Sequence, residues 1–383
     1  MRDPWYKTTF QYDIFDRHLT MHIPHDVFST QRIDEGTLLF LEHLPESKPK
    51  SILDMGCGYG ALGLPIAAIH PDAHVDLVDR DLLAVEWSKK NAAANSLGNV
   101  NAFGSLGFRD VRGKYDWILC NVPARIGEPF IKNLIHHGCA RLNPGGELRV
   151  VVINDLIPFV NEMKLIATGP RHSIFAIRAE ETAGEAIAPE KLYLRDQVKV
   201  ADLTLDRPFD LGGDDQKRLK TGLPVLIDAL PRKIPNGEFK VLCFRAGYGQ
   251  IPLIARKRWA DASVTAVDRD LLGTTFIAHN ASVLGLDGNR LEVRENAFLP
   301  FALGAEEKFN LILGELSPSA GETVAISELE TIEDHLAKGG EALILCLEKI
   351  EKDWVKKFAS QTKLSVFKVL SRDGYTVVRF NKT

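Results

Sequence analysis

A glycine-rich turn follows a short apolar segment in the pattern Asp54-x-Gly56-x-Gly58-x-Gly60. An apolar strand that ends in an acid and such a turn is typical of a nucleotide-type ligand site at the end of a parallel sheet. A second carboxylate, Asp79, follows Asp54 by 25 residues and closes the next apolar segment. At that place a carboxylate can accept hydrogen bonds from both hydroxyls of a ribose. The spacing therefore predicts a site for a cofactor that contains ribose.

The spacing of the glycines separates two cofactor classes. By itself, the turn is also compatible with a strand-to-helix connection that binds nothing, and Asp79 would serve an NAD site equally well. The usual dinucleotide turn has the pattern G-x-G-x-x-G, whereas this one has G-x-G-x-G. With an acid two residues before the first glycine, the pattern resembles class I S-adenosylmethionine-dependent methyltransferases. The resemblance implies S-adenosyl-L-methionine as the cofactor, with the turn packed against its methionine and ribose atoms.

A second motif indicates the acceptor. Residues 114–127, Lys-Tyr-Asp-Trp-Ile-Leu-Cys-Asn-Val-Pro-Ala-Arg-Ile-Gly, resemble the fourth-strand signature F-D-x-I-x-x-N-P-P plus an aromatic, found in amino-group methyltransferases. In that family the Asn side chain and the next carbonyl accept hydrogen bonds from the target NH2 and aim the nitrogen lone pair at the methyl, which is catalysis by orientation. The resemblance implies Asn121 and Pro123 as catalytic residues.

Three replacements depart from the family pattern. Val122 stands in place of one proline, and Ala124 in place of the aromatic that would stack on a flipped base. Arg125 can stack instead, or it is a loop arginine that faces solvent. Ser105-Leu106 stands where the third strand usually ends in an Asp or Asn near the adenine amino group, so that only backbone contacts there would hold adenine.

The stretch 19–39 contains Val-Phe-Ser and Ile-Asp-Glu-Gly-Thr-Leu-Leu, which resembles the start of the small-domain methyltransferases that modify guanine N2 in ribosomal RNA. Those enzymes are tandem duplications with one inactive copy, and the likeness extends over nearly the whole chain. It implies that Phe28 and Ser29 lie over the cofactor, and that Thr37 begins the helix beneath it. The residues expected to bind cofactor are Phe28, Asp54, Gly56, Cys57, Gly58, Gly60, Asp79, Arg80, Ser105 and Asn121.

The glycine turn occurs twice. Residues 240–249 repeat residues 51–60, and Asp79 matches Asp268 at an offset of 189. The offset is 194 from Lys114 and Lys308 onward. A period this long indicates domain duplication rather than a solenoid. We predict a cofactor-binding domain over 1–182 and a degenerate methyltransferase-like domain over 183–383, joined by the small, polar segment 180–190.

The second copy has lost the residues that the first would use. Cys243 replaces the acid before the turn, Arg245 replaces its first glycine, and Glu315 replaces Asn121. An arginine there would fill space that the ligand needs, and its charge would repel a sulfonium. Asp268 is kept, most simply by inheritance. We therefore predict that this half is a scaffold or a substrate-docking domain, although the better-known family members keep the intact site in their C-terminal half.

Alternating elements must position these residues. Apolar strands are predicted over 51–55, 74–78, 117–120 and 148–153, the last one after a Pro144-Gly-Gly turn. Helices are predicted over 62–69, 82–96 and 130–141. Strands that alternate with helices form a parallel sheet covered on both faces. The expected class is α/β, with two tandem Rossmann-like methyltransferase domains, each a mostly parallel sheet flanked by helices.

Bulk properties set the remaining expectations. The 383 residues carry a net charge of −4, which neither demands nor excludes a nucleic-acid partner. The final segment, from Lys352 to Lys382, is a candidate basic patch for RNA, or equally a solvated surface. With no apolar signal region, we expect a cytoplasmic protein. Five cysteines without a CxxC pair indicate reduced, buried thiols. The spacing of His18, His22 and His25 would suit a metal site on a helix, but Pro24 argues against a helix there and no Cys or carboxylate completes a ligand set, so no metal site is expected.

The preferred function is an S-adenosylmethionine-dependent N-methyltransferase of an exocyclic amino group, with guanine N2 of ribosomal RNA as the target and ribosomal RNA or a ribosomal subunit as the partner. Two alternatives remain open. The net negative charge and the lack of an aromatic residue at position 124 favour a methyltransferase that acts on a protein glutamine or on a small-molecule amine. Because the motifs are altered, a non-catalytic scaffold that binds RNA or protein is the second alternative. No membrane or metal partner is expected, and a monomer is preferred.

Overall fold

The computed structural model describes residues 3–27, 33–178, 189–209 and 218–383. The chain divides into two compact units, here called the first domain (Tyr6–Leu194) and the second domain (Arg195–Thr383 with the N-terminal residues up to Trp5). The predicted boundary between residues 182 and 183, and most of the predicted linker, lie outside the described residues. That boundary therefore stays a prediction.

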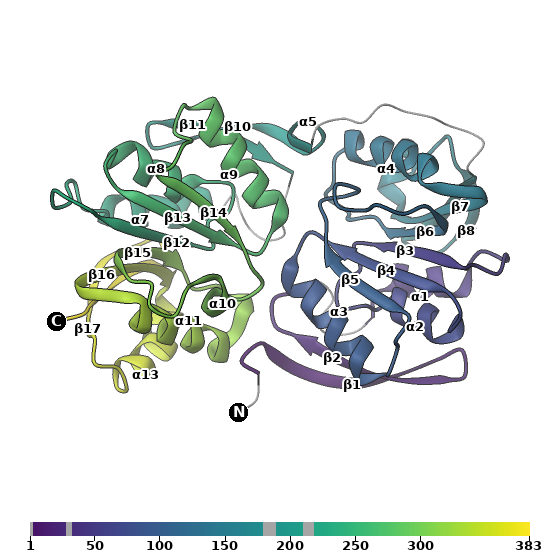
Figure 1. Ribbon diagram of the computed structural model, residues 1–383, viewed down its shortest axis with the longest axis horizontal. Helices are drawn as coiled ribbons and strands as arrows, with labels where there is room; N and C mark the ends of the chain where they lie inside the picture. The colour runs from purple at the N-terminus through teal and green to yellow at the C-terminus, as the bar shows by residue number, and fades with distance from the viewer. Residues whose placement is uncertain (1–2, 28–32, 179–188, 210–217) are drawn as a thin grey trace. The chain divides into compact units, whose positions relative to one another are not determined.

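The first domain is built on a seven-stranded sheet with the strand order β5-β4-β3-β6-β7-β9-β8 (Figure 1). The strands from β5 to β7 are parallel, whereas β9 runs antiparallel to β7 and β8 antiparallel to β9. Their bounds are β3 (Ser51–Met55), β4 (His74–Asp79), β5 (Val100–Gly104), β6 (Tyr115–Asn121), β7 (Leu142–Ile153), β8 (Lys164–Thr168) and β9 (His172–Arg178).

Helices pack against strands on both sides of the sheet's central pair, β3 and β6. α2 and α3 contact β4, and α1 and α4 contact β7 and β9. The bounds are α1 (Glu35–Glu42), α2 (Gly63–Ile69), α3 (Leu82–Ala94), α4 (Glu128–Ala140), α5 (Pro189–Leu192) and the 3-10 helix η1 (Asn154–Phe159). The continuously apolar central strands are buried, as expected for strands covered on both faces, with Ile52, Leu53 and Trp117 at most 1% exposed.

The second domain repeats this sheet with the order β14-β13-β12-β15-β16-β18-β17. The strands are β12 (Lys240–Phe244), β13 (Ser263–Asp268), β14 (Leu291–Glu295), β15 (Phe309–Glu315), β16 (Leu336–Leu347), β17 (Ser365–Arg372) and β18 (Tyr375–Asn381). The helices are η2 (Arg218–Gly222), α7 (Leu223–Ala229), α8 (Gln250–Arg258), α9 (Leu271–Val283), α10 (Leu299–Ala302), η3 (Pro318–Ala320), α11 (Gly321–His335), α12 (Glu348–Ile350), η4 (Glu351–Val355) and α13 (Lys356–Ala359). The predicted class, with two mostly parallel sheets flanked by helices, is confirmed.

A two-stranded hairpin precedes each sheet, β1 (Tyr6–Ile14) with β2 (Arg17–Pro24) and β10 (Leu194–Val200) with β11 (Leu203–Pro208). Asn91 and Asn280, which match at the offset of 189 between the two copies, hold the two hairpins. Asn91 on α3 exchanges hydrogen bonds with the backbone of His22 at 2.7 and 3.0 Å. Asn280 on α9 does the same with Asp206 at 2.8 and 2.9 Å. The duplication therefore includes the hairpin, although its two sequences show no obvious likeness.

One predicted turn is wrong in its position. Pro144-Gly-Gly was expected to precede the strand, but β7 already begins at Leu142, which pairs with Tyr115. The pairing resumes at Trp117 and Glu147 after a register shift. Residues 143–146 therefore form an irregularity inside the strand, and Gly145 supplies the positive φ of 76° that this irregularity requires.

All five cysteines are buried and free, as predicted. Across the described ranges, no helix is long and apolar enough to cross a membrane. The same residues contain no group of three or more His, Cys, Asp or Glu that could hold a metal ion.

Candidate functional site

The glycine turn after β3 leaves open space in front of its backbone. Gly56, Gly58 and Gly60 have φ values of 79°, 57° and 95°, a region that side chains other than glycine rarely adopt. A Cβ atom added to Gly56 or Gly58 would meet nothing within 4 Å, whereas at Gly60 it would lie 2.4 Å from Leu64. The first two glycines thus leave room for a ligand against the turn, and the third allows α2 to pack closely.

Asp79 fastens this turn to the next helix. Its carboxylate oxygens accept hydrogen bonds from the backbone N–H of Gly58 and of Asp81, each at 2.9 Å. Burial raises the pKa of Asp79, and these two donors counteract the rise. A carboxylate can accept about four hydrogen bonds, so the two oxygens can still accept hydrogen bonds from hydroxyl groups of a ligand. The position at the end of β4 is the one predicted for a ribose contact.

Asp54 lies beneath the turn and not in its open space. Its side chain is 1% exposed and accepts a hydrogen bond from the backbone N–H of Gly63 at the start of α2. Within the described part of the chain, its Oδ2 has no hydrogen-bond partner. Burial, opposed by that N–H, raises the pKa of Asp54 to about 7. The acid of the motif therefore supports the turn from inside the domain.

Replacing Asp54 with asparagine is expected to remove a pH-dependent loss of stability. Because its pKa rises from 3.8 to about 7 on folding, the unfolded chain ionises first as the pH increases. The wild-type free energy of unfolding should therefore fall between about pH 4 and pH 7, by up to roughly 4 kcal/mol. Asparagine can still accept the Gly63 N–H, so the variant should gain on the wild type between pH 5 and pH 8, measured by urea unfolding.

Asp116→Asn is the matched control for this measurement. Burial alone would raise the pKa of Asp116, but hydrogen bonds from Lys50, Asn143 and Ser51 lower it overall. Its stabilising effect is complete above about pH 4, so its loss should cost the same free energy at pH 5 and at pH 8. An equal effect of Asp54→Asn at both pH values would contradict the buried-acid assignment.

Asn121 ends β6 with a fixed side-chain orientation. Its Nδ2 donates to Asp34 Oδ1 and to Thr37 Oγ1, both at 3.1 Å. Asp34 is the N-cap of α1 and accepts from the Thr37 backbone N–H at 3.1 Å and from its hydroxyl at 2.5 Å. Since an ionised carboxylate only accepts, the NH2 group must face α1. The amide oxygen of Asn121 is thereby kept as an acceptor for another group.

Asp34 is the main site residue that the sequence did not reveal, although Asp at position 34 before a helix is a recognisable N-cap signal. Asp34→Ala is expected to misorient Asn121 and so to lower the rate constant of the predicted amine methylation by about 10- to 100-fold, with affinity for the predicted cofactor unchanged. Single-turnover kinetics with calorimetry would separate the two quantities.

The matched control is Asp270→Ala, because Asp270 caps α9 through the Leu272 N–H at 2.9 Å and is remote from β6 in sequence. The Asp270→Ala variant loses a comparable helix cap but leaves the orientation of the Asn121 side chain unchanged. If both variants slowed the reaction equally, the effect would be a general loss of stability and Asp34 would not be a positioning residue.

The other predicted residues differ in what they offer a ligand. Cys57 is buried, with Sγ 3.5 Å from Ser88 Oγ, and burial raises the pKa of its thiol well above the ordinary value. Ser105 Oγ donates to Gly107 O at 2.7 Å and accepts from Asp110 N–H at 3.1 Å, so its side chain shapes its own loop. Arg80 is partly exposed. Phe28, together with Ser29, lies outside the described residues.

The loop after Asn121 is open to solvent at its tip. Pro123, Ala124 and Arg125 are exposed, whereas Val122 is buried and its N–H donates to Val151 O at 3.0 Å. The Ile126 N–H donates to Pro123 O at 3.2 Å and closes a turn. The replacement of one proline by valine thus preserves a structured loop, and the missing aromatic leaves its tip without a ring.

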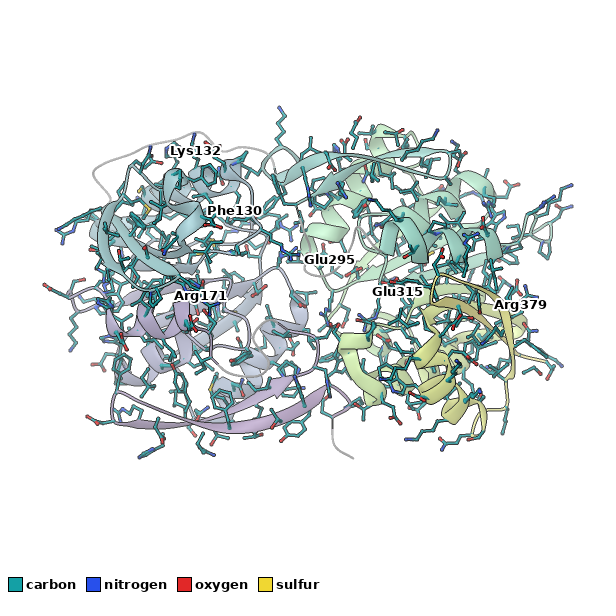
Figure 2. All side chains as sticks on the ribbon, turned by 180° about the vertical axis from the view of Figure 1, so that it is seen from behind. Phe130, Lys132, Arg171, Glu295, Glu315 and Arg379 are labelled. Carbon is teal, nitrogen blue, oxygen red and sulfur yellow. The ribbon has the colours of Figure 1, made fainter. Side chains whose placement is uncertain are left out.

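An aromatic pair lies beside the third-strand loop. Phe130 on α4, labelled in Figure 2, packs on Tyr193 with ring centroids 5.3 Å apart. A Cβ atom added to Gly107 would lie 3.2 Å from the Tyr193 hydroxyl. Both rings are buried, so they support the loop after β5. No local pattern predicts this contact, because Tyr193 is far from the loop along the chain.

The second domain keeps the backbone of the turn but not its chemistry. Asp268 accepts from Gly247 N–H at 2.8 Å and from Asp270 N–H at 3.0 Å, as Asp79 does in the first domain. This structural role accounts for its retention better than inheritance alone. Cys243 offers no carboxylate and Pro252, the counterpart of Gly63, no N–H, so the support beneath the turn is lost from both sides.

Arg245 adopts the glycine-like φ of 49°. Its guanidinium donates to Glu328 Oε1 at 2.9 Å from Nη2 and 3.1 Å from Nε. The predicted repulsion of a sulfonium is therefore weaker than expected, because Glu328 offsets the charge, whereas the bulk of the side chain remains. Glu315, labelled in Figure 2, ends β15 at the position of Asn121.

Half of the eight cations in the basic C-terminal segment, residues 352–382, are paired with carboxylates. Four of its cations form ion pairs: Lys357 with Glu322, Lys368 with Glu351, Arg372 with Asp228 and Arg379 with Glu341. β17 is the edge strand of its sheet. These contacts favour the solvated surface over a dedicated RNA patch.

Comparison with known proteins agrees with this arrangement. The family model described as methyltransferase small domain matches residues 18–165. The protein YbxB from Bacillus subtilis is 31% identical over 149 residues, which cover 38% of this chain and 74% of that protein. Ribosomal RNA small subunit methyltransferase C from Hahella chejuensis is 36% identical over 142 residues, 35% of this chain. The matched region spans only 40% of that relative's length.

A solved structure extends the likeness to both domains. The 16S rRNA guanine-N2 methyltransferase from T. thermophilus, in complex with AdoMet and guanosine, aligns over 99% of both chains with a TM-score of 0.70. The sequence identity is 17%, so this likeness concerns the fold.

Proposed function

Because this chain belongs to the methyltransferase small-domain family, we propose that its first domain is an S-adenosylmethionine-dependent N-methyltransferase of an exocyclic amino group. The observation that carries the proposal is the fixed amide of Asn121, whose NH2 group is held by Asp34 and Thr37. An acceptor oxygen held in this way suits an amine substrate, since it can take one N–H and orient the nitrogen.

The residues around the turn fit the cofactor. The space in front of Gly56 and Gly58 accommodates a ligand against the backbone, and Asp79 has acceptor capacity for ribose hydroxyls. Asp79 would hold the ribose, and residues 56–60 the methionine end. Ser105 would contribute backbone contacts to the adenine. When bound, the cofactor supplies a methyl group on a cationic sulfur.

The chain itself contributes orientation. Asn121 Oδ1 and the carbonyl of Val122 would each accept one N–H of the target amine, which turns the nitrogen lone pair toward the methyl group. Pro123 would limit the conformations of this loop, since its ring fixes φ. No strong base is required, because acceptors on both N–H groups localise the lone pair on the nitrogen, and the extra proton of the methylated amine can pass to water after the new bond forms. Positioning of this kind accounts for a large share of the rate in two-substrate reactions.

We propose guanine N2 of ribosomal RNA as the target and the cytoplasm as the place of action. The support for ribosomal RNA is the name of the Hahella relative, and the support for guanine N2 is the substrate named for the T. thermophilus structure. The exposed Arg125 is suited to stack on a base in place of the missing aromatic. The absence of a ring at the exposed Ala124 is the observation that favours the second candidate, a protein glutamine or small-molecule amine.

Mass mapping of modified nucleosides tests the substrate. Ribosomal RNA from cells with and without this protein is digested, and N2-methylguanosine is quantified in defined fragments. Loss of one N2-methylguanosine site in cells that lack the protein, restored by the wild type but not by Asn121→Ala, supports the proposal. An unchanged profile would rule out ribosomal guanine and favour the other amines. A protein that binds no S-adenosylmethionine would instead be a scaffold.

A further inference from the structure

The N-terminal residues are fastened to the second domain. The carbonyl of Pro4 accepts a hydrogen bond from Thr323 Oγ1 at 2.6 Å, close to the start of α11. The Trp5 N–H donates to Asp3 Oδ1 at 2.9 Å, and the Trp5 side chain is only 6% exposed. Trp5 is therefore a buried residue of the second domain.

The indole of Trp5 is surrounded by residues from three loops. The guanidinium carbons of Arg245 and Arg269 lie 5.9 and 5.6 Å from the ring centroid, within reach of cation–π attraction. The ring of Phe298 meets it edge-on, with centroids 5.8 Å apart at 60°. Arg245 follows β12, Arg269 follows β13, and Phe298 follows β14.

These loops are the counterparts of the predicted cofactor-binding loops in the first domain. Arg245 corresponds to Gly56, and Arg269 corresponds to Arg80 beside the ribose acid. Phe298 follows Asn296, whose N–H donates to Asp268 O at 3.1 Å. The Ser105 N–H makes the same bond to Asp79 O at 3.0 Å. Trp5 therefore lies where the turn, the ribose-side loop and the adenine-side loop converge.

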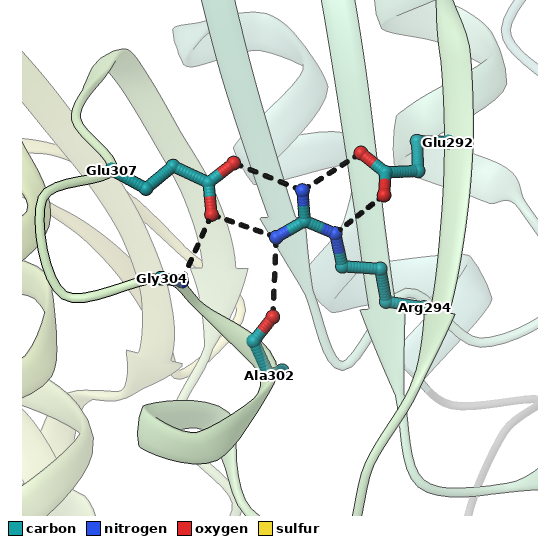
Figure 3. A network of polar contacts seen from close by, with 5 residues as sticks. All are labelled: Glu292, Arg294, Ala302, Gly304 and Glu307. Atoms are coloured by element: carbon teal, nitrogen blue, oxygen red, sulfur yellow. Dashed lines mark hydrogen bonds and ion pairs between the residues drawn. The ribbon is translucent and has the colours of Figure 1, made fainter.

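The loop that carries Phe298 is anchored by charged side chains (Figure 3). Arg294 on β14 is held on one side by Glu292, at 2.8 Å from both Nε and Nη2. On the other side it donates to both oxygens of Glu307, at 2.7 and 2.9 Å, and to Ala302 O at 3.1 Å. Paired bidentate contacts of this kind fix geometry, so residues 298–307 present Phe298 in a defined position.

We propose that the former cofactor site of the second domain is now a receptor for an aromatic side chain, and that Trp5 of the same chain is its occupant. Arg245, the substitution for Gly56 that excludes the first domain's chemistry, fits this role, and it acts beside Arg269, which both domains share as Arg80 and Arg269. Arg245 and Arg269 supply cations to the faces or edges of the indole, Glu328 offsets the charge of Arg245, and Phe298 supplies an aromatic wall. The second domain thus binds its own N-terminus in place of a small molecule.

Indole rescue of the full-length Trp5→Ala variant tests the proposal. The variant should have a lower melting temperature than the wild type. It should bind added indole with a stoichiometry of one in calorimetry, and indole should raise its melting temperature. The wild type, whose site is filled, should bind indole at least about tenfold more weakly. The double variant with Arg269→Met should lose most of the indole binding, because the cation beside the ring is removed.

Two outcomes would overturn the proposal: absence of indole binding to Trp5→Ala, or equal binding with and without Arg269→Met. Should Trp5→Ala fail to fold, fluorine NMR of protein labelled with 5-fluorotryptophan gives an independent answer. The Trp5 resonance is assigned by its loss in Trp5→Phe. It should shift on Arg269→Met in the otherwise wild-type chain, and an unshifted resonance would contradict the proposed contact. Neither readout depends on the activity of the first domain.

Discussion

Replacing Asp79 with alanine is expected to weaken S-adenosylmethionine binding by about 100-fold or more. Hydrogen bonds to a charged group contribute roughly 1.5–3 kcal/mol each, and two ribose hydroxyls would lose their acceptor. The substitution also removes the contacts to Gly58 and Asp81 at 2.9 Å, which hold the turn against the start of α3. Both effects lower affinity, and titration calorimetry with S-adenosylhomocysteine measures their sum.

The duplication supplies a matched control in Asp268→Ala. Asp268 makes the equivalent contacts to Gly247 and Asp270, at 2.8 and 3.0 Å. Its loss should destabilise the second domain by a comparable amount without changing the affinity or the stoichiometry of one ligand per chain. A wild-type stoichiometry of two, or an Asp79→Ala variant with normal affinity, would contradict the assignment of the site to the first domain.

Replacing Asn121 with alanine is expected to lower the rate of methyl transfer by about 100- to 1,000-fold, the range found when one preorganised polar contact at a reacting group is removed. S-adenosylmethionine affinity should change little, because the amide acts on the amine and not on the ribose. The acceptor oxygens of Asp34 and Thr37 would lose the Asn121 donor, and the helix cap at the Thr37 N–H would remain. Single-turnover kinetics with saturating cofactor measures the effect.

Glu315→Ala is the control for Asn121→Ala, because Glu315 ends β15 at the equivalent position. It should leave the rate unchanged. If both substitutions lowered the rate equally, the second domain would take part in the chemistry. That result would contradict the account, because the second domain lacks the counterparts of Asp54, Gly56 and Asn121.

Local patterns were enough to predict the fold and the outline of the site. Apolar strands that end in Met55, Asp79 and Asn121 place these residues at the same edge of a parallel sheet, so their proximity follows from topology. The glycine turn was identified for the same reason, since positive φ values and close ligand approach both require glycine at these positions.

Contacts between distant segments were not predictable in this way. Asp34 and Asn121 are 87 residues apart, and nothing in either local pattern specifies that one donates to the other. The role of Asp54 was also misplaced: the motif suggests a ligand contact, whereas the burial of its carboxylate against Gly63 makes it a support beneath the turn. Trp5 packs against loops some 240 to 293 residues away, where no periodicity could reveal it.

The central claim is that Asn121 in the first domain presents a guanine amine to S-adenosylmethionine. It is tested most directly by incubating purified protein with S-adenosylmethionine carrying a 13C-labelled methyl group and small-subunit ribosomal RNA that lacks N2-methylguanosine, followed by mass spectrometry of the nucleosides. The account predicts labelled N2-methylguanosine with the wild type and with Glu315→Ala, and at least about 100-fold less with Asn121→Ala. Equal labelling by all three proteins, or a label on any other nucleoside position, would contradict it.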